Sequence, residues 1–202
     1  MKKQLLRAHW IFLFTFIFSS VFGQPKAHFA HKHDHESKPL FIENKNQWHE
    51  NVEFKTGFNG SVSLYLEKTG FTYVLSNPED LRQVHDLALK DRKKLNDLVI
   101  RNHAYKVHFL DANEPTLKSD RPQVFYHNYF LGNDPSKWAS RVQLFEEVTY
   151  ENLYDQIDLI AYSQDGHFKY DFVVNPGADV SDLKLKYEGT DGLKLVYGDL
   201  NI

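Results

Sequence analysis

Segments in which apolar and polar residues alternate are the feature that most constrains the fold of this chain. In residues 61–67, Val62, Leu64 and Leu66 fall on one face, which is the period-two pattern of a half-buried strand. Residues 68–70 form a turn signal, and residues 71–75 return as the hairpin partner. Residues 103–110 alternate in the same way. These patterns predict an antiparallel sheet.

Further strand candidates follow along the chain, separated by turn signals rich in Gly, Asn, Asp and Pro. They are residues 52–56, 124–131, 142–150, 157–162, 167–174, 183–187 and 193–197. Strands at this spacing, roughly one every 10 residues, are typical of sandwiches and barrels. The sequence therefore predicts a mainly β fold, an antiparallel β-sandwich-like domain.

One amphipathic helix is expected as an insertion in the sheet. Asn77 can cap it, Pro78 suits its first position, and Glu79 and Asp80 favour the positive end of the helix dipole. Its apolar stripe comprises Leu81, Val84, Ala88, Leu95 and Leu98. The basic cluster of residues 90–94 could bind phosphate or a polyanion, but the neighbouring acids favour a solvated helix face.

The N-terminal residues predict export. Lys2, Lys3 and Arg7 precede an apolar stretch at 11–22, which is shorter than the about 20 residues of a membrane-spanning helix. We expect residues 1–23 to be a signal peptide cleaved near Gly23, residues 24–39 to be a flexible His-rich leader, and residues 40–202 to be the folded domain. The chain has no cysteine, so packing alone must stabilise that domain.

The net charge of −3 is too small to predict a nucleic-acid partner or an anionic-membrane partner, so the membrane enters only through export. The domain is expected to be truncated at its C-terminus, because residues 193–202 read as a strand, a tight turn and the start of a returning strand.

Catalytic signatures are missing from the sequence, which holds no nucleophile elbow, Walker loop or dinucleotide-binding motif. Glu146 and Glu147 are adjacent on an expected strand and should face opposite sides, so we expect them not to share a site. Asp155 and Asp158 could converge in a loop. The sequence predicts no enzyme, no catalytic residue and no cofactor.

The sequence offers candidates for two metal sites and one ligand site. His31, His33 and His35 could chelate a transition metal, although a flexible, solvated leader is the commoner explanation of such a segment. Loop oxygens suited to calcium come from Asn133, Asp134, Asp155 and Asp158, which are also ordinary turn residues. Tyr129 and Trp138 could stack on a sugar, although core packing is the commoner fate of aromatic side chains.

Four segments resemble motifs of a known family. F-I-E-N-K-N-Q-W at 41–48 resembles the "F-x-E-N-x-G-Q-W/F" opening of a domain of unknown function at the N-terminus of large secreted bacterial proteins. N-Y-F-L-G-N-D-P-S-K-W at 128–138 resembles its second motif. V-T-Y with L-Y and I-D-L at 148–159, and K-Y-D-F-V-V-N-P-G-A-D at 169–179, are similar to its third and fourth.

Two departures stand out: Asn46 replaces the usual Gly, and the charged helix around residues 78–99 is longer than the usual connection. Such domains precede SBBP β-propeller-type repeats, immunoglobulin-like or PKD modules, and often a gliding-motility-associated C-terminal domain exported by the type IX system. The resemblance transfers no catalytic residue.

The resemblance implies a non-catalytic module of a secreted or cell-surface multidomain protein, with an adhesive or architectural role. Its partners would be downstream domains of the same chain, surface proteins or glycans. The alternative is a carbohydrate-binding or hydrolase-accessory domain, which a cleft lined by Trp138 with nearby exposed carboxylates would favour.

Overall fold

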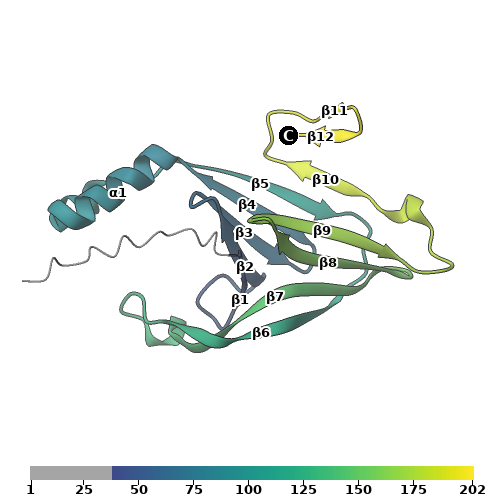
Figure 1. Cartoon of the computed structure of the whole chain (residues 1–202), viewed down its shortest axis with the longest axis horizontal. Helices are drawn as coiled ribbons and strands as arrows, with labels where there is room; N and C mark the ends of the chain where they lie inside the picture. The colour runs from purple at the N-terminus through teal and green to yellow at the C-terminus, as the bar shows by residue number, and fades with distance from the viewer. Residues whose placement is uncertain (1–37) are drawn as a thin grey trace, which may run out of the picture. The chain divides into compact units, whose positions relative to one another are not determined.

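The computed structural model describes residues 38–202 (Figure 1). The expected signal peptide, most of the leader and the three histidines His31, His33 and His35 lie outside the described residues. Within the described part, no helix is both long enough and apolar enough to cross a membrane.

Ten strands form one antiparallel sheet, and two more form a separate hairpin. Most of the strands lie where the alternating segments predict them. The strands of the sheet are β1 (Phe41–Glu43), β2 (Val52–Phe58), β3 (Val62–Glu67), β4 (Gly70–Ser76), β5 (Asn102–Phe109), β6 (Thr116–Tyr129), β7 (Ala139–Tyr154), β8 (Ile157–Gln164), β9 (His167–Val174) and β10 (Leu185–Glu188). The hairpin consists of β11 (Lys194–Val196) and β12 (Asp199–Asn201).

The sheet curls because its two halves are joined through short strand β1. The strand order is β10-β5-β4-β3-β2-β1-β7-β8-β9, with β6 on the other edge of β7. β1 pairs with Leu144 and Phe145 of β7, and β8 pairs with the same strand from Glu147 onward. One continuous sheet thus supplies both facing layers (Figure 1). The predicted mainly β, antiparallel fold is confirmed, and its sandwich-like core lies inside a single curled sheet.

The core lies between these two halves. Phe71 of β4 is 1% exposed, and its ring lies 5.0 Å from that of Phe109, 6.0 Å from Tyr150 and 5.5 Å from both Phe168 and Tyr170. These edge-on and tilted contacts join β4 to β5, β7 and β9, and aromatic rings favour such geometry. Strand alternation places Leu64 and Leu66 in the same core, as their sequence pattern predicts.

Gly70 begins β4 where no side chain fits. A Cβ atom on Gly70 would lie 2.0 Å from the carbonyl oxygen of Val107 in β5, and the residue has a φ of 155°. The hairpin between β3 and β4 therefore needs glycine at this position, directly after the two-residue turn of Lys68 and Thr69.

The inserted helix is α1 (Pro78–Lys90), and it begins as its sequence predicts. The Asn77 side chain accepts hydrogen bonds from the amides of Glu79 and Asp80. The expected apolar stripe is divided, because α1 ends at Lys90 and a 3₁₀ helix, η1 (Arg92–Asp97), carries Leu95. The helix packs against η1 and extends away from the sheet (Figure 1).

Candidate binding surface

The first family-like motif folds into a hydrogen-bonded loop between β1 and β2. The Asn44 side-chain amide donates to the carbonyl oxygens of His49, at 2.9 Å, and Val52, at 2.7 Å, and its Oδ1 accepts from the Trp48 amide at 3.2 Å. Gln47 Nε2 donates to the Glu43 carbonyl at 2.6 Å. These bonds fix the backbone on both sides of Trp48, so the loop presents its indole in a defined position.

The second family-like motif forms the end of β6 and the loop to β7. Asp134 Oδ1 accepts from the amide of Ser136 at 3.0 Å and from its hydroxyl at 2.7 Å, which caps a short 3₁₀ helix, η2 (Pro135–Lys137). These bonds hold the pKa of Asp134 below its ordinary value. Trp138 Nε1 donates to the Gly132 carbonyl at 3.3 Å, and its ring packs edge-on against Phe130.

The two motif loops meet although 80 or more residues separate them. The rings of Trp48 and Tyr129 lie edge to face with centroids 5.6 Å apart. Asn46 Nδ2 donates to the Ser136 carbonyl at 3.3 Å, where the two are 90 positions apart, and Lys45 Nζ donates to the Arg141 carbonyl at 2.9 Å. We call the surface formed by residues 44–51 and 125–138 the motif surface.

A groove of about 810 Å³ adjoins the motif surface. Its lining combines the two motif loops with the ends of two hairpins, β2–β3 and β8–β9. The lining residues are Pro39, Ile42, Gln47, Trp48, Lys55, Thr56, Gly57, Phe58, Asn59, Gly60, Val62, Ser63, Tyr129, Leu131, Asp165, Gly166 and His167. The volume lies within the range of about 300–1,000 Å³ found for small-molecule sites.

Lys55 is the positively charged side chain that β2 contributes to this groove. Its Nζ lies 5.5 Å from the ring centroid of Trp48 and 5.3 Å from that of Tyr65, so two aromatic faces hold the ammonium group. Among residues 38–202, no carboxylate forms an ion pair with Lys55.

The aromatic residues near the end of β6 lie on the surface, and here the preference for core packing was wrong. Tyr126 is 50% exposed, Phe130 59% and Trp138 43%, and Leu131 beside them is 75% exposed. β6 pairs with β7 alone within the described chain, at an edge of the sheet, and its side chains are almost all exposed or half-buried. Tyr129, by contrast, is half-buried against Trp48, and burial raises the pKa of its hydroxyl.

The two candidate sugar-stacking residues are therefore placed differently. Tyr129 lines the groove, whereas Trp138 does not. Trp48, rather than the predicted Trp138, lines the groove beside Tyr129. Its position at the end of the first motif was a signal that could have found it, whereas nothing in the local pattern around Lys55 marks that residue.

The four calcium candidates are not brought together. Asn133 and Asp134 precede β7, whereas Asp155 and Asp158 follow it, and this strand of 16 residues spans about 50 Å. Asp155 accepts from Asn113 Nδ2 at 3.2 Å, and Asp158 accepts from the Asn152 amide at 2.7 Å. Within residues 38–202, no three His, Asp or Glu side chains are grouped as metal ligands.

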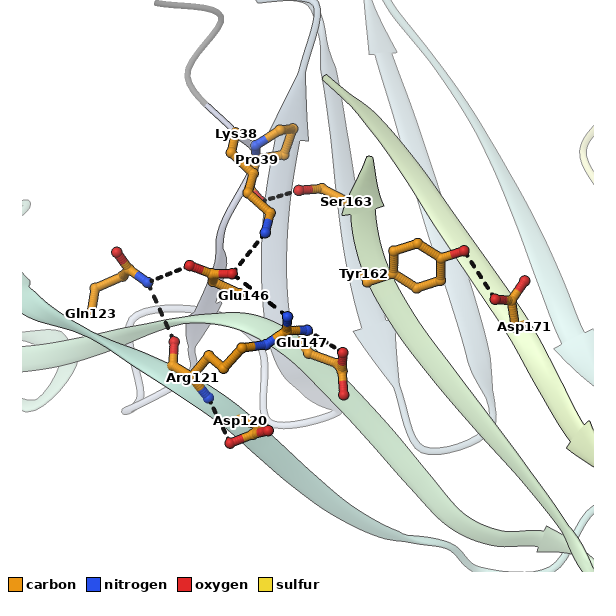
Figure 2. Close-up of polar contacts among 10 residues, drawn as sticks. All are labelled: Lys38, Pro39, Asp120, Arg121, Gln123, Glu146, Glu147, Tyr162, Ser163 and Asp171. Carbon is orange, nitrogen blue, oxygen red and sulfur yellow. Dashed lines mark hydrogen bonds and ion pairs between the residues drawn. The ribbon is translucent and has the colours of Figure 1, made fainter. Parts of the chain in front are cut away.

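Glu146 and Glu147 meet one guanidinium, so the expectation that they could not share a site was wrong (Figure 2). Arg121 Nη2 bonds to Glu147, and Arg121 Nη1 lies 3.9 Å from Glu146. Although the carboxylates start from opposite faces, the Arg121 side chain, from a residue with a φ of 55°, reaches both. Lys38 Nζ donates to Glu146 at 2.7 Å, which is the main reason that the pKa of this carboxyl lies below its ordinary value.

In this cluster the positive charges of Lys38 and Arg121 neutralise the two carboxylates. Two further hydrogen bonds nearby join β8 to Pro39 and to β9. Ser163 Oγ donates to the Pro39 carbonyl at 2.9 Å, and the Tyr162 hydroxyl donates to Asp171 at 2.9 Å (Figure 2). Lys38 stabilises the charged form of Glu146, so this carboxyl is a poor proton donor.

The third and fourth family-like motifs serve the fold. Tyr150 is fully buried, and its hydroxyl donates to the Glu67 carbonyl at 3.1 Å. Tyr170 and Phe172 face the core, while Asp171 faces outward and accepts from Tyr162. Asp179 caps a short 3₁₀ helix, η3 (Val180–Asp182). Of the four motifs, the first two build the motif surface.

A family model described as "Domain of unknown function (DUF7948)" matches residues 41–202. No curated protein matches the chain. No solved structure matches it either.

Proposed function

The chain belongs to the family described as Domain of unknown function (DUF7948), and we propose that it is a non-catalytic binding module of a secreted or cell-surface multidomain protein, with an adhesive or architectural role. In this proposal the motif surface is the part that binds.

The observation that carries the proposal is the convergence of the first two motifs. Side chains from 44–51 and 125–138 meet across the sheet, and several large apolar ones among them stay exposed. Exposed apolar patches rimmed by polar groups are typical of interaction sites. A loop surface held by a rigid sheet is also the usual place for binding residues.

Export supports the extracellular location in this proposal. The basic start, the apolar stretch at 11–22 and the small residues near Gly23 follow the layout of a signal peptide. A chain without cysteine, which relies on packed aromatic residues such as Phe71, suits an exported domain that forms no disulfides.

The finer assignment rests on the motif resemblance. Segments 41–48, 128–138, 148–159 and 169–179 are similar to the N-terminal domain that precedes SBBP repeats or gliding-motility-associated C-terminal domains. We propose that this chain has the same neighbours, and that its partners are those downstream domains, surface proteins or glycans. The gene sequence beyond residue 202 tests this directly: repeats and a sorting domain support it, and an adjoining hydrolase domain contradicts it.

Export is tested with the full chain expressed in a bacterium that has a secretory pathway. We expect a mature protein that begins near Gln24, because small residues lie at positions 21 and 23. Mass spectrometry of the N-terminal peptide measures this. An uncleaved chain that stays in the cytoplasm would contradict the extracellular role.

Binding is tested by displaying the full chain on a non-adherent host cell and counting cells retained on biotic and abiotic surfaces. The double variant Phe130→Ser with Leu131→Ser removes two exposed apolar side chains of the motif surface. We expect it to reduce retention at least fivefold, since such a patch supplies most of the apolar contact.

The matched control is Leu89→Ser on helix α1, because Leu89 is 74% exposed and lies outside the motif surface. It should retain cells as the parent chain does. Equal loss in both variants, or no retention by the parent chain, overturns the assigned role of the motif surface.

A further inference from the structure

We propose that the groove beside the motif surface binds a carbohydrate chain that bears carboxylate groups, a uronate polysaccharide. This inference rests on the proposed function and names the ligand class of the same surface.

The aromatic part of the groove suits a sugar ring. Trp48 and Tyr129 meet edge to face at 5.6 Å and both line the groove, so they form a corner of two rings. The hydrogen bonds of Asn44 hold the Trp48 backbone in place, so little conformational entropy is lost when a ligand packs against the indole.

The charge of the groove suits a carboxylate on that sugar. Lys55 Nζ is held between the rings of Trp48 and Tyr65 and forms no ion pair among residues 38–202. An ammonium group that is positioned but not neutralised is ready to donate a charge-assisted hydrogen bond to an anion. Because Lys55 lies against Trp48, a ring at the aromatic corner would bring its carboxylate to the ammonium group.

Polar groups at the hairpin ends suit the sugar hydroxyls. Asn59 and Ser63 line the groove from the β2–β3 hairpin, and Asp165 lines it from the β8–β9 turn. An Asp carboxylate accepts hydrogen bonds from hydroxyls but repels a uronate, so we place the uronate at Lys55 and the hydroxyls at the β8–β9 turn.

The test is affinity electrophoresis of the full chain in gels that contain polygalacturonate, neutral dextran or polyglutamate. We expect retardation by polygalacturonate alone. Lys55→Gln should weaken the apparent affinity about tenfold, which is the effect of one lost charge-assisted hydrogen bond. Lys169→Gln, on the exposed side of β9, removes the same charge away from the groove and should change the affinity less than twofold.

Four results would overturn the inference. An equal loss of affinity for polygalacturonate in Lys55→Gln and Lys169→Gln indicates general electrostatic attraction. Equal retardation by polyglutamate indicates an anion site without sugar selectivity, and equal retardation by dextran removes the role of the carboxylate. Absence of binding to any polymer by a folded chain, with unchanged circular dichroism, removes the site itself. If no polymer binds but the Phe130→Ser, Leu131→Ser double variant still reduces cell retention, only the uronate inference fails and the proposed function is unaffected.

Discussion

Asn46 has a left-handed backbone conformation, with a φ of 80°, in the loop that presents Trp48. L-residues reach this region at a cost, and Asn tolerates it better than most because its short side chain bonds locally. The family pattern that the sequence resembles has Gly here. Asn46 thus adopts a conformation that Gly would reach without strain, and it adds a bond from its Nδ2 to the Ser136 carbonyl in the neighbouring loop.

At this residue we predict a difference between two small substitutions. Asn46→Ala should lower the free energy of unfolding by about 1 kcal/mol more than Asn46→Gly, because both lose the bond to Ser136 but only alanine is strained at positive φ. Urea denaturation measures both, with exposed Asn96→Ala as a control. Equal stability of the two variants would show that backbone strain is unimportant here.

The positions of some residues could be predicted from the sequence, whereas those of others could not. The cap at Asn77 and the inward positions of Leu64 and Leu66 follow from neighbours along the chain, and the structure has them as the sequence predicts. The pairing of Trp48 with Tyr129 depends on tertiary contacts, which local pattern does not encode. The exposure of Trp138 likewise depends on which strand lies at the edge of the sheet.

At the scale of elements, a charged clamp joins helix α1 to the start of β5. Asp80 is 5% exposed and accepts from the Arg101 side chain at 2.9 and 2.7 Å and from the Arg101 amide at 2.9 Å. These bonds lower the pKa of Asp80 to about 2. Since the helix has little other contact with the sheet, the clamp fixes where the inserted segment returns to β5.

Stability of this junction should depend on pH with a definite sign. A lowered pKa in the folded state means that Asp80 stabilises the fold above its unfolded pKa of about 3.9, and that this stabilisation is lost as the pH falls towards 2. We expect Asp80→Asn to speed amide exchange in α1 at pH 7. The difference in urea midpoint from the parent chain should shrink as the pH falls from 4 to 2.

The matched control is Asp97→Asn, which removes an exposed carboxylate of η1. It should leave both the exchange rates and the urea midpoint unchanged across the same pH range. A gap between Asp80→Asn and the parent chain that persists at pH 2 would contradict the clamp.

Elements were predictable where their signal is local. The β3–β4 hairpin and β5 follow from alternation and turn residues, and both lie where expected. β6 begins at Thr116, well before the expected 124, because pairing with β7 extends it through residues of weak alternation. The apolar stripe of the helix was expected to continue past Lys90, but Asp91 ends the helix and starts η1.

At the scale of the whole molecule, the core depends on Phe71, which joins strands of both halves. Phe71→Ala should lower the free energy of unfolding by about 3–5 kcal/mol, because it removes a fully buried ring and leaves a cavity between the facing halves of the sheet. Phe130→Ala deletes the same side chain on the surface and should change stability by about 0.5 kcal/mol or less. Thermal and urea unfolding of both variants measures this. Similar losses in the two would place the core elsewhere.

The fold class was predictable from strand spacing, but the curl was not. It depends on β1, three residues long, which pairs with β2 on one side and with β7 on the other. Such a short segment carries almost no periodicity, and its second partner lies far along the chain. The groove arises from the same arrangement, so its lining could not be assembled from the sequence.

The position of β1 also sets the order in which the domain can fold. Glu43, in β1, accepts a bond from the amide of Gln143, 100 positions later, and Ile42 pairs with Leu144. Bringing such distant segments together costs loop-closure entropy, and folds rich in distant pairings form slowly. The pairings among β1, β2, β3 and β4 join segments that are close along the chain, whereas the pairing of β1 with β7 must wait until β7 is present. The two halves of the sheet therefore close late. This delay suits the export that we propose, because a chain whose halves are still apart can pass through an export channel.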